Sequence, residues 1–215
     1  MHSGFPRYIA IEGPIGVGKT SLAELLAEPL NARLLLEEAY RNPFLEQFYD
    51  NRTRYAFQTQ IFFLLSRFQQ QKELLQPDLF QSGVVSDYLF SKDRIFACLN
   101  LDENELALYD RLYKLLDPQT ARPDLVIYLQ ASSEVLWDRI RRRGMEFENG
   151  ISLEYLERLI ELYHQFFFRY EETPLLVVNT SEIDFVNDPE DLTQLVKKIT
   201  SVKHGTQHYI PLGSR

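Results

Sequence analysis

The sequence predicts a three-layer α/β protein, in which helices cover both faces of a five-stranded parallel sheet. Short runs rich in Ile, Val and Leu recur along the chain with little polar alternation, and such runs are typical of parallel strands buried on both faces. Longer amphipathic segments separate them. Strand, helix and strand in repeated order imply right-handed crossovers, and therefore a sheet between two helical layers.

Each predicted strand is one of these apolar runs. In chain order they are Tyr8–Glu12, Arg33–Glu37, Gly83–Asp87, Asp124–Gln130 and Leu175–Thr180. The helical stretches between them include "SLAELLAEPL", "FQTQIFFLLSRFQQQKELL", "SSEVLWDRIRRRG" and "LEYLERLIELYHQFFFRYEE". Residues 204–215 follow neither a helical nor a strand period. We therefore expect one domain over residues 1–203, followed by a loosely packed tail.

The composition is that of a soluble globular protein. The chain has 215 residues, of which 45% are hydrophobic and 25% are charged. Its net charge of −8 and isoelectric point near 5.1 argue against a nucleic-acid binder, because phosphate backbones require a basic surface. A small anionic ligand in a locally basic pocket remains compatible with this charge.

The compartment also follows from composition. The single cysteine, Cys98, allows no intrachain disulfide, which favours a reducing environment. The N-terminal stretch lacks the pattern of a signal peptide, and no apolar run is long enough to cross a bilayer. We expect a cytoplasmic protein that acts without a membrane.

The segment "EGPIGVGKTSLAELL" directly after the first predicted strand fits the phosphate-binding pattern G-x-x-x-x-G-K-[ST]. Backbone N–H groups of such a loop surround phosphate oxygens, aided by the positive end of the following helix. Lys19 adds a charge at the β- and γ-phosphates, and the Thr20 hydroxyl can bind Mg²⁺. The alternative is a glycine-rich turn. The pattern predicts a nucleoside triphosphate, ATP or another, held by Gly13, Pro14, Ile15, Gly16, Val17, Gly18, Lys19 and Thr20.

Carboxylates stand at the carboxyl ends of two of the predicted strands. Glu37 ends the second strand and Glu38 follows it, and Asp87 ends the third. Ligands of open parallel sheets bind beyond the carboxyl ends of the strands, so these side chains are expected beside the phosphate loop. There a carboxylate can accept a proton from an attacking hydroxyl or hold Mg²⁺. The alternative is that both glutamates end a strand in solvent.

Arginines cluster before a glycine in "WDRIRRRGMEFENG". On a helix Arg139, Arg142 and Arg143 share one face. This arrangement suits a lid over residues 139–151 that closes on a transferring phosphate and offsets its charge. A charged surface face that pairs with Glu134 and Asp138 is the alternative.

The mostly apolar helix "YAFQTQIFFLLSRF" includes Gln60 and Arg67, two turns apart on the same side. Such a pair can read the hydrogen-bonding edge of a base while phenylalanines stack on it. The same two residues can equally lie on the rim of the helix.

Together these motifs resemble the deoxynucleoside kinase family, and in particular its bacterial deoxyguanosine and deoxyadenosine kinases. The similarity extends from "IAIEGPIGVGKT" to the region around "LEYLERLIELY". The segments that carry it are "GPIGVGKT", "EEAYRNPFLEQFYDN", "FQTQIFFLLSRF", "SDYLFSKDRIFA" and "DRIRRRGMEFENGISLEYLE". In combination they are far more specific than the phosphate loop alone.

The resemblance implies roles for the matching positions. The family's catalytic base is a glutamate that ends strand two, five residues before the Asn of an "NP" pair. Counting back from Asn42 selects Glu37. The positions that grip the sugar 3′-hydroxyl match Tyr49 and Glu148.

Further matches concern the base and the lid. The base-reading glutamine matches Gln60, and an arginine–aspartate pair at the base matches Arg67 and Asp93. The lid arginines match Arg139 and Arg143. The resemblance also implies a homodimer.

Two positions depart from the family pattern. Many members have an acid and an arginine after strand three, where this chain has Asp87 and Tyr88. Asp87 keeps the acid, which with Thr20 is expected to hold Mg²⁺ directly or through water. Tyr88 cannot carry the missing charge, although both positions are expected at the substrate site. Met145 stands where some relatives have another lid arginine.

We therefore expect transfer of the γ-phosphoryl group of ATP to the 5′-hydroxyl of deoxyguanosine, deoxyadenosine or both. Glu37 would accept the hydroxyl proton, while Lys19, Arg139 and Arg143 offset charge. One alternative is a thymidylate-type monophosphate kinase, whose acceptor needs an arginine where this chain offers Tyr88. Another is a non-catalytic nucleotide-binding subunit, which would retain affinity without producing ADP.

Overall fold

The protein is described by a computed structural model over residues 7–74, 83–148 and 150–210, apart from the side chain of Phe147. Residues 1–6 of the predicted domain, position 149 of the predicted lid and residues 211–215 of the predicted tail lie outside this description.

Within the described ranges a single sheet has six parallel strands in the order β2-β3-β1-β4-β5-β6. The strands are β1 Tyr8–Glu12, β2 Ala32–Leu35, β3 Gly83–Ser86, β4 Leu125–Gln130, β5 Leu175–Asn179 and β6 Thr206–Tyr209. Every residue of β1 is buried, because this strand lies inside the sheet and between two helical layers. The predicted α/β class is confirmed.

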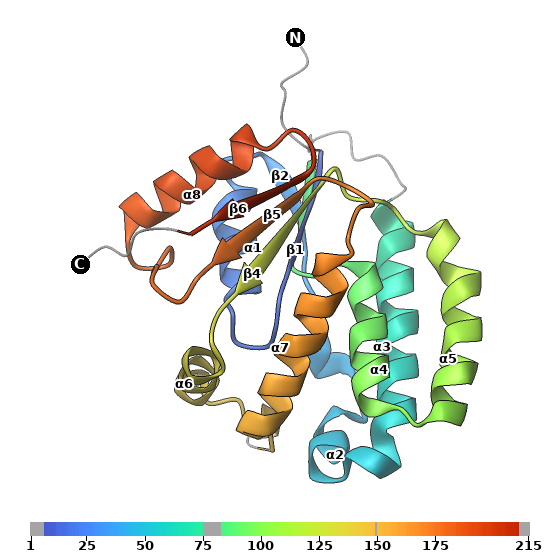
Figure 1. The fold of residues 1–215 in the computed structure, drawn as a ribbon. Helices are drawn as coiled ribbons and strands as arrows, with labels where there is room; N and C mark the ends of the chain where they lie inside the picture. The colour runs from blue at the N-terminus through green and yellow to red at the C-terminus, as the bar shows by residue number, and fades with distance from the viewer. Residues whose placement is uncertain (1–6, 75–82, 149, 211–215) are drawn as a thin grey trace.

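Helices pack on both faces of the sheet (Figure 1). The α-helices are α1 Lys19–Ala27, α2 Leu45–Asp50, α3 Arg52–Leu74, α4 Asp93–Asn100, α5 Glu103–Leu116, α6 Ser133–Arg143, α7 Leu153–Phe168 and α8 Pro189–Ser201. Short 3₁₀ turns are η1 Ala39–Arg41, η2 Phe90–Lys92, η3 Asp117–Gln119 and η4 Glu146–Glu148. Helices α1 and α8 cover one face, and α3, α4 and α7 cover the other, with α5 packed outside α3 and α4 (Figure 1).

The sixth strand corrects the prediction of five. Residues 204–210 were expected to stay outside the sheet, yet Thr206–Tyr209 pairs with β5 in parallel register. The segment has no buried residue, because an edge strand has a neighbour on one side only. An edge strand therefore needs no apolar run of the kind that marks the inner strands.

The second strand ends earlier than predicted. It stops at Leu35, and the backbone N–H of Asp87 donates to the Leu35 carbonyl at 3.2 Å. The backbone N–H of Glu37 instead donates to the Asp87 carboxylate at 2.7 Å. Glu37 therefore lies just beyond the carboxyl edge of the sheet, beside the third strand.

The loops that follow β1 and β4 lie at this carboxyl edge, the lower edge in Figure 1, where α6 and α2 also lie. The backbone of the first loop passes close to β4. A Cβ on Gly13, whose φ is +155°, would stand 2.5 Å from the Leu129 carbonyl oxygen. The loop therefore follows a path that a side chain at position 13 would block.

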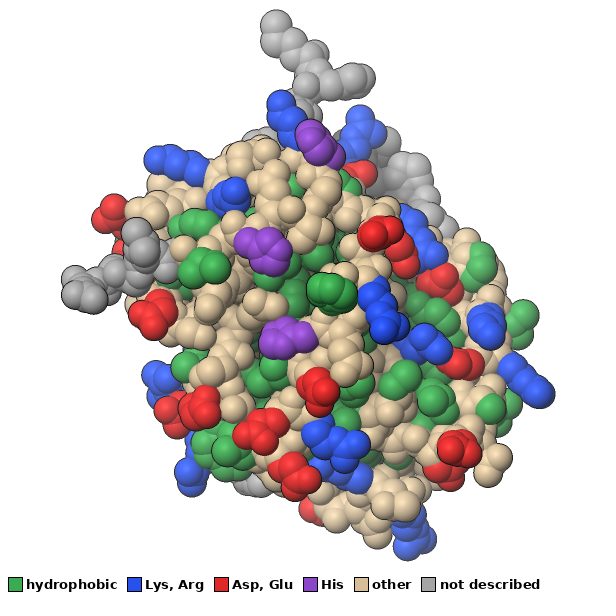
Figure 2. Space-filling view, viewed as in Figure 1, with side chains coloured by type: hydrophobic (Ala, Val, Ile, Leu, Met, Phe, Trp, Pro, Cys, Tyr) green, Lys and Arg blue, Asp and Glu red, His purple; other side chains and the backbone are tan. Residues whose placement is uncertain are grey.

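Basic and acidic side chains are interspersed over the described surface seen in Figure 2, which presents no continuous basic area on that face. This distribution agrees with the acidic net charge. Among the described residues, no helix has both the length and the apolar character needed to span a membrane.

Candidate active site

Two adjoining cavities lie at the carboxyl edge of the sheet. The first, of about 310 Å³, is lined by Glu37, Gln60 and Asp87 together with several aromatic rings. The second, of about 600 Å³, is lined by the glycine loop and by α6. Both are bordered by Gly16, Lys19, Thr20 and Arg143. A phosphoryl group at this shared border would be accessible to ligands on both sides.

The glycine loop adopts the conformation that its pattern predicts. Gly16 and Gly18 have φ of 83° and 102°, and α1 begins directly after Gly18. The Lys19 ammonium donates to the carbonyls of Gly13 at 2.7 Å and Pro14 at 3.1 Å. Burial and the nearby Lys92 cation lower the pKa of Lys19 to about 8. An anionic phosphate beside Lys19 would favour its charged form.

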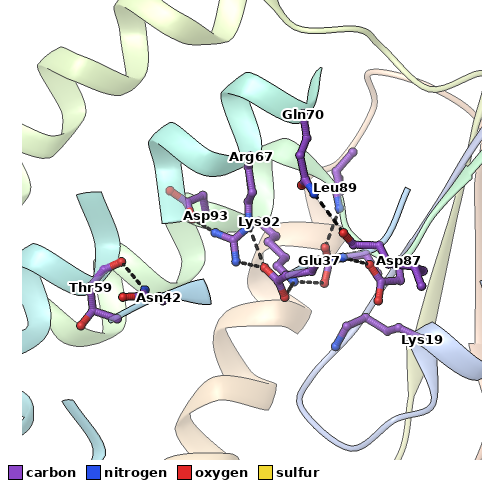
Figure 3. Close-up of polar contacts among 12 residues, drawn as sticks. Lys19, Glu37, Asn42, Thr59, Arg67, Gln70, Asp87, Leu89, Lys92 and Asp93 are labelled. Atoms are coloured by element: carbon purple, nitrogen blue, oxygen red, sulfur yellow. Dashed lines mark hydrogen bonds and ion pairs between the residues drawn. The ribbon is translucent and has the colours of Figure 1, made fainter. Parts of the chain in front are cut away.

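Glu37 lies between two cations (Figure 3). Its Oε1 accepts from Arg67 Nε at 2.8 Å, and its Oε2 accepts from Lys92 Nζ at 3.1 Å. Burial favours the neutral carboxyl, but Arg67, Lys92 and Lys19 outweigh it and hold the pKa of Glu37 far below its usual range. Glu37 is therefore an ionised carboxylate at the wall of the first cavity. Glu38 pairs with Arg41 instead.

An oxygen pair lies beside Glu37. The Thr20 hydroxyl donates to Asp87 Oδ2 at 2.6 Å, and both residues line the first cavity. No group of three or more His, Cys, Asp or Glu side chains suited to a metal ion occurs among the described residues. The oxygen pair nevertheless fits Mg²⁺, which binds through one or two protein oxygens, substrate phosphates and water.

Glu12, the last residue of β1, contacts both the glycine loop and the segment after β3. Its fully buried carboxylate accepts from the N–H groups of Gly13 and Leu89, each at 2.8 Å, and from the Tyr163 hydroxyl at 2.9 Å. Lys92 Nζ lies 3.9 Å from its Oε1. Glu12 thus joins the start of the glycine loop to the segment after β3.

Arg67 also pairs with Asp93, whose other oxygen accepts from the Tyr109 hydroxyl at 2.7 Å. The Arg67 guanidinium lies over the Phe63 ring, with Cζ 4.7 Å from the centroid. Gln60, one turn before Phe63 on α3, is 2% exposed, and its Oε1 has no hydrogen-bond partner among the described residues. A buried acceptor without a partner suits a ligand that brings a donor.

The arginines of the predicted lid make different contacts. Arg139 donates to the carbonyls of Thr180 at 2.8 Å and Val17 at 3.3 Å, and so ties α6 to the glycine loop. Arg142 and Arg143 line the second cavity with it. Arg143 Nε also donates to Glu148 Oε2 at 3.1 Å.

The far end of the predicted lid, at Gly150, contacts the first residue of α3. The Arg52 guanidinium donates to the Gly150 carbonyl at 2.8 Å and lies 4.1 Å from the centroid of the Tyr155 ring. A Cβ on Gly150 would stand 2.9 Å from the Tyr49 carbonyl oxygen. Burial raises the pKa of Tyr49, so its phenol remains neutral near Glu148.

Most predicted site residues line these cavities, although Gly13, Pro14, Tyr88 and Asp93 do not. The first cavity is bordered by Tyr49, Gln60, Arg67, Met145 and Glu148, and by Lys19, Glu37 and Arg143 among the catalytic candidates. The second is bordered by residues 16–20 of the loop and by Arg139. Asp93 is fully buried behind Arg67 and does not line either cavity.

Tyr88 is also fully buried and borders neither cavity. Its backbone carbonyl accepts from the Ser86 hydroxyl at 2.7 Å. The side chain of Tyr88, predicted at the substrate site, therefore lies in the core and not at the wall of either cavity.

Sequence reasoning missed Lys92, Phe96 and Tyr155, which line the first cavity. Lys92 gave one signal: "SKDR" places charged residues at the beginning of an otherwise apolar helix. Phe96 and Tyr155 gave none, because core packing produces the same helical spacing.

A glycine loop between β1 and α1, a carboxylate in the adjoining cavity and an oxygen pair suited to Mg²⁺ define a phosphotransferase with a P-loop kinase fold. The sequence model of the family described as deoxynucleoside kinase matches residues 9–204. The chain therefore belongs to the deoxynucleoside kinase family.

Individual relatives agree with this assignment. A deoxyadenosine kinase of Dictyostelium discoideum is 40% identical, with the similarity covering 88% of this chain and 78% of that protein. A deoxyguanosine kinase of Bacillus subtilis is 35% identical over 89% of this chain and 95% of that protein. A solved structure of deoxyadenosine kinase from M. mycoides with bound dCTP superposes with a TM-score of 0.78 at 27% identity, and covers 90% of this chain and 99% of that one.

Proposed function

We propose that this kinase transfers the γ-phosphoryl group of ATP to the 5′-hydroxyl of a purine deoxyribonucleoside, deoxyguanosine or deoxyadenosine, in deoxynucleotide salvage. The observation that carries the proposal is the position of the Glu37 carboxylate, which lines the same cavity as Lys19 and Thr20 of the phosphate loop. Relatives named deoxyadenosine kinase and deoxyguanosine kinase support the choice of a purine acceptor.

The first cavity has features that suit an uncharged nucleoside. Apart from Lys19 of the phosphate loop, the cations that line it already have carboxylate partners: Arg67 and Lys92 pair with Glu37, and Arg143 pairs with Glu148. A monophosphate acceptor would bring additional negative charge and would require a cation without a carboxylate partner. Aromatic rings and the unpartnered Gln60 Oε1 suit a base instead.

The catalytic step we propose is a direct displacement. Glu37 accepts the proton of the 5′-hydroxyl as its oxygen bonds to the γ-phosphorus. The bond between that phosphorus and the β,γ-bridging oxygen breaks, and its electron pair leaves on ADP. Mg²⁺ held by Thr20 and Asp87 would offset charge on the β- and γ-phosphates. Lys19, Arg139 and Arg143 add positive charge around the triphosphate.

Recognition of the sugar and the base would use the cavity walls. Tyr49 and the lid residue Glu148 line the first cavity and are proposed to bind the 3′-hydroxyl. Gln60 is proposed to contact the base, and Arg67, braced by Asp93, to support that contact. A lid over residues 139–151 would close the site during transfer.

Three further features belong to this proposal. We infer a requirement for Mg²⁺ from the oxygen pair at Thr20 and Asp87. We also propose a homodimer and a cytoplasmic location, both on the resemblance to the family. Chelation of divalent ions tests the requirement for Mg²⁺, and sedimentation equilibrium tests the homodimer.

An ADP-release assay tests the function. It compares the four deoxynucleosides, their ribonucleoside forms and their 5′-monophosphates, with the product identified by mass. We expect ADP release with deoxyguanosine or deoxyadenosine, and no release in a Lys19→Met control. Turnover with monophosphates alone would indicate a monophosphate kinase, whereas binding without ADP release would indicate a non-catalytic subunit.

A further inference from the structure

Lys92 is a nearly completely buried cation at the centre of the site. Its side chain is 2% exposed, and its ammonium lies between two carboxylates. The distances are 3.1 Å to Glu37 Oε2 and 3.9 Å to Glu12 Oε1. A buried charge is costly unless it is paired. The pairing directs this ammonium at the wall of the first cavity.

The position of Lys92 is determined by groups that also determine the glycine loop. Lys92 ends η2, and the Leu89 N–H just before that turn donates to Glu12 at 2.8 Å. The same carboxylate accepts from Gly13 N–H at 2.8 Å and from the Tyr163 hydroxyl at 2.9 Å. The carboxylate that contacts the start of the phosphate loop therefore also lies beside the Lys92 ammonium.

Lys92 and Arg67 act on different oxygens of Glu37. Arg67 Nε contacts Oε1, and Arg67 has Asp93 as a second counter-charge. Lys92 contacts Oε2, while Lys19 donates to carbonyls of its own loop. Among the described residues, Lys92 is therefore the cation that orients Oε2 (Figure 3).

The residue at position 88 cannot supply the positive charge beside Glu37. Tyr88 is uncharged and fully buried, and it does not line the cavity. Lys92 is four residues further along the same segment, and the 3₁₀ turn η2 brings its side chain back to the carboxylate. The segment after β3 thus carries a cation to Glu37 from a different backbone position.

We propose that Lys92 is a positioning residue for phosphoryl transfer: its ammonium orients the Glu37 carboxylate toward the acceptor hydroxyl and keeps a positive charge beside the oxygen that attacks. This inference rests on the proposed function. A positioned charge of this kind acts most strongly in the transition state, where negative charge moves onto transferring oxygens. Binding of the neutral nucleoside needs it far less.

The test compares Lys92→Met, Lys92→Gln and Lys92→Arg with the parent enzyme. Methionine removes the charge at similar length, glutamine keeps a hydrogen-bond donor, and arginine keeps the charge. Lys203→Met, at an exposed position outside both cavities, is the matched control. For each protein we measure kcat with ATP and the preferred deoxynucleoside, the nucleoside Kd by calorimetry, and the thermal unfolding temperature.

We expect kcat of Lys92→Met to fall about 100-fold, the range measured when one preorganised donor is removed, with the nucleoside Kd changed less than about threefold. Lys92→Arg should regain at least about a tenth of the parental kcat. Lys92→Gln should resemble methionine, and it supplies the comparison if the methionine variant does not fold. The control should match the parent.

Two outcomes overturn the inference. One is an uncharged variant that keeps kcat within about threefold of the parent. The other is a result in which kcat, nucleoside affinity and unfolding temperature all fall in the uncharged variants and Lys92→Arg restores none of them. Such a result would indicate a structural role for Lys92. A parent without turnover on any deoxynucleoside would end the proposed function as well, whereas an active parent with an active Lys92→Met would end only this inference.

Discussion

Replacing Glu37 by glutamine removes one negative charge from the first cavity while nearly preserving the shape of the side chain. The change leaves the backbone contact from Glu37 N–H to Asp87 in place. It alters only the carboxylate, whose two oxygens face Arg67 and Lys92. The variant therefore separates the proposed proton transfer from the architecture around it.

The magnitude follows from those contacts. Loss of a general base reduces a rate by about 10² to 10⁴-fold, which is about 3–5 kcal/mol in activation free energy. An amide offers one oxygen, so it retains one of the two cation contacts. A hydrogen bond to a charged group contributes about 1.5–3 kcal/mol. We expect a loss of unfolding free energy at the low end of that range, because the Glu37 side chain is 20% exposed.

The assay is steady-state ADP release, with nucleoside binding measured separately by calorimetry. We expect kcat to fall at least about 100-fold, while the nucleoside Kd changes by less than about threefold. Glu38→Gln is the control, because it makes the same chemical change one residue away, where the carboxylate pairs with Arg41. A Glu37→Gln enzyme with parental turnover, or a control that loses as much activity, would refute the assignment of the base.

Three further predictions concern the loop, the lid and the phosphate-binding lysine. Gly13→Ala should lower the free energy of unfolding by about 2–4 kcal/mol, because its Cβ would meet the Leu129 carbonyl oxygen at 2.5 Å. The control is Gly144→Ala, where φ is +67° but the space is open, and it should lose about 1 kcal/mol. Equal losses for the two variants in thermal unfolding would contradict the predicted clash at position 13. Glu148→Gln should weaken deoxynucleoside binding about tenfold through a lost charged hydrogen bond and leave a 2′,3′-dideoxynucleoside unaffected; equal weakening of both would exclude the 3′-hydroxyl contact. Because the pKa of Lys19 is lowered to about 8, its amine is largely neutral at pH 9 and should become protonated when phosphate binds. Calorimetry of magnesium-free ATP binding, in buffers of different ionisation enthalpy, should therefore show proton uptake at pH 9 and little at pH 7. Proton uptake that does not rise with pH would refute the lowered pKa of Lys19.

Much of the fold was readable from the sequence because the signals are local. An inner parallel strand buries both faces, so a five-residue run such as Tyr8–Glu12 identifies itself. The glycine loop needs particular backbone angles and one lysine, and these requirements produce a recognisable pattern. The spacing of Arg139, Arg142 and Arg143 likewise predicted a shared helix face, and all three line the second cavity.

The sixth strand was hidden from the sequence for a physical reason. Thr206–Tyr209 has no buried residue, so it lacks the apolar run by which inner strands are recognised. Its place is given by the open edge of β5, to which it pairs from Leu175↔Thr206 onward. Such an edge exists only after the other strands have assembled.

The sequence by itself determined which chemical groups were available: a phosphate loop, carboxylates after two strands and arginines before a glycine. Only the tertiary structure decided which of them meet. Lys92 contacts Glu37, which is 55 positions away in the chain. Tyr88 is much closer to Lys92 in sequence, yet its side chain is buried in the core. Contacts of this kind depend on strand order and on how each turn leaves the sheet, and no spacing along the chain encodes them.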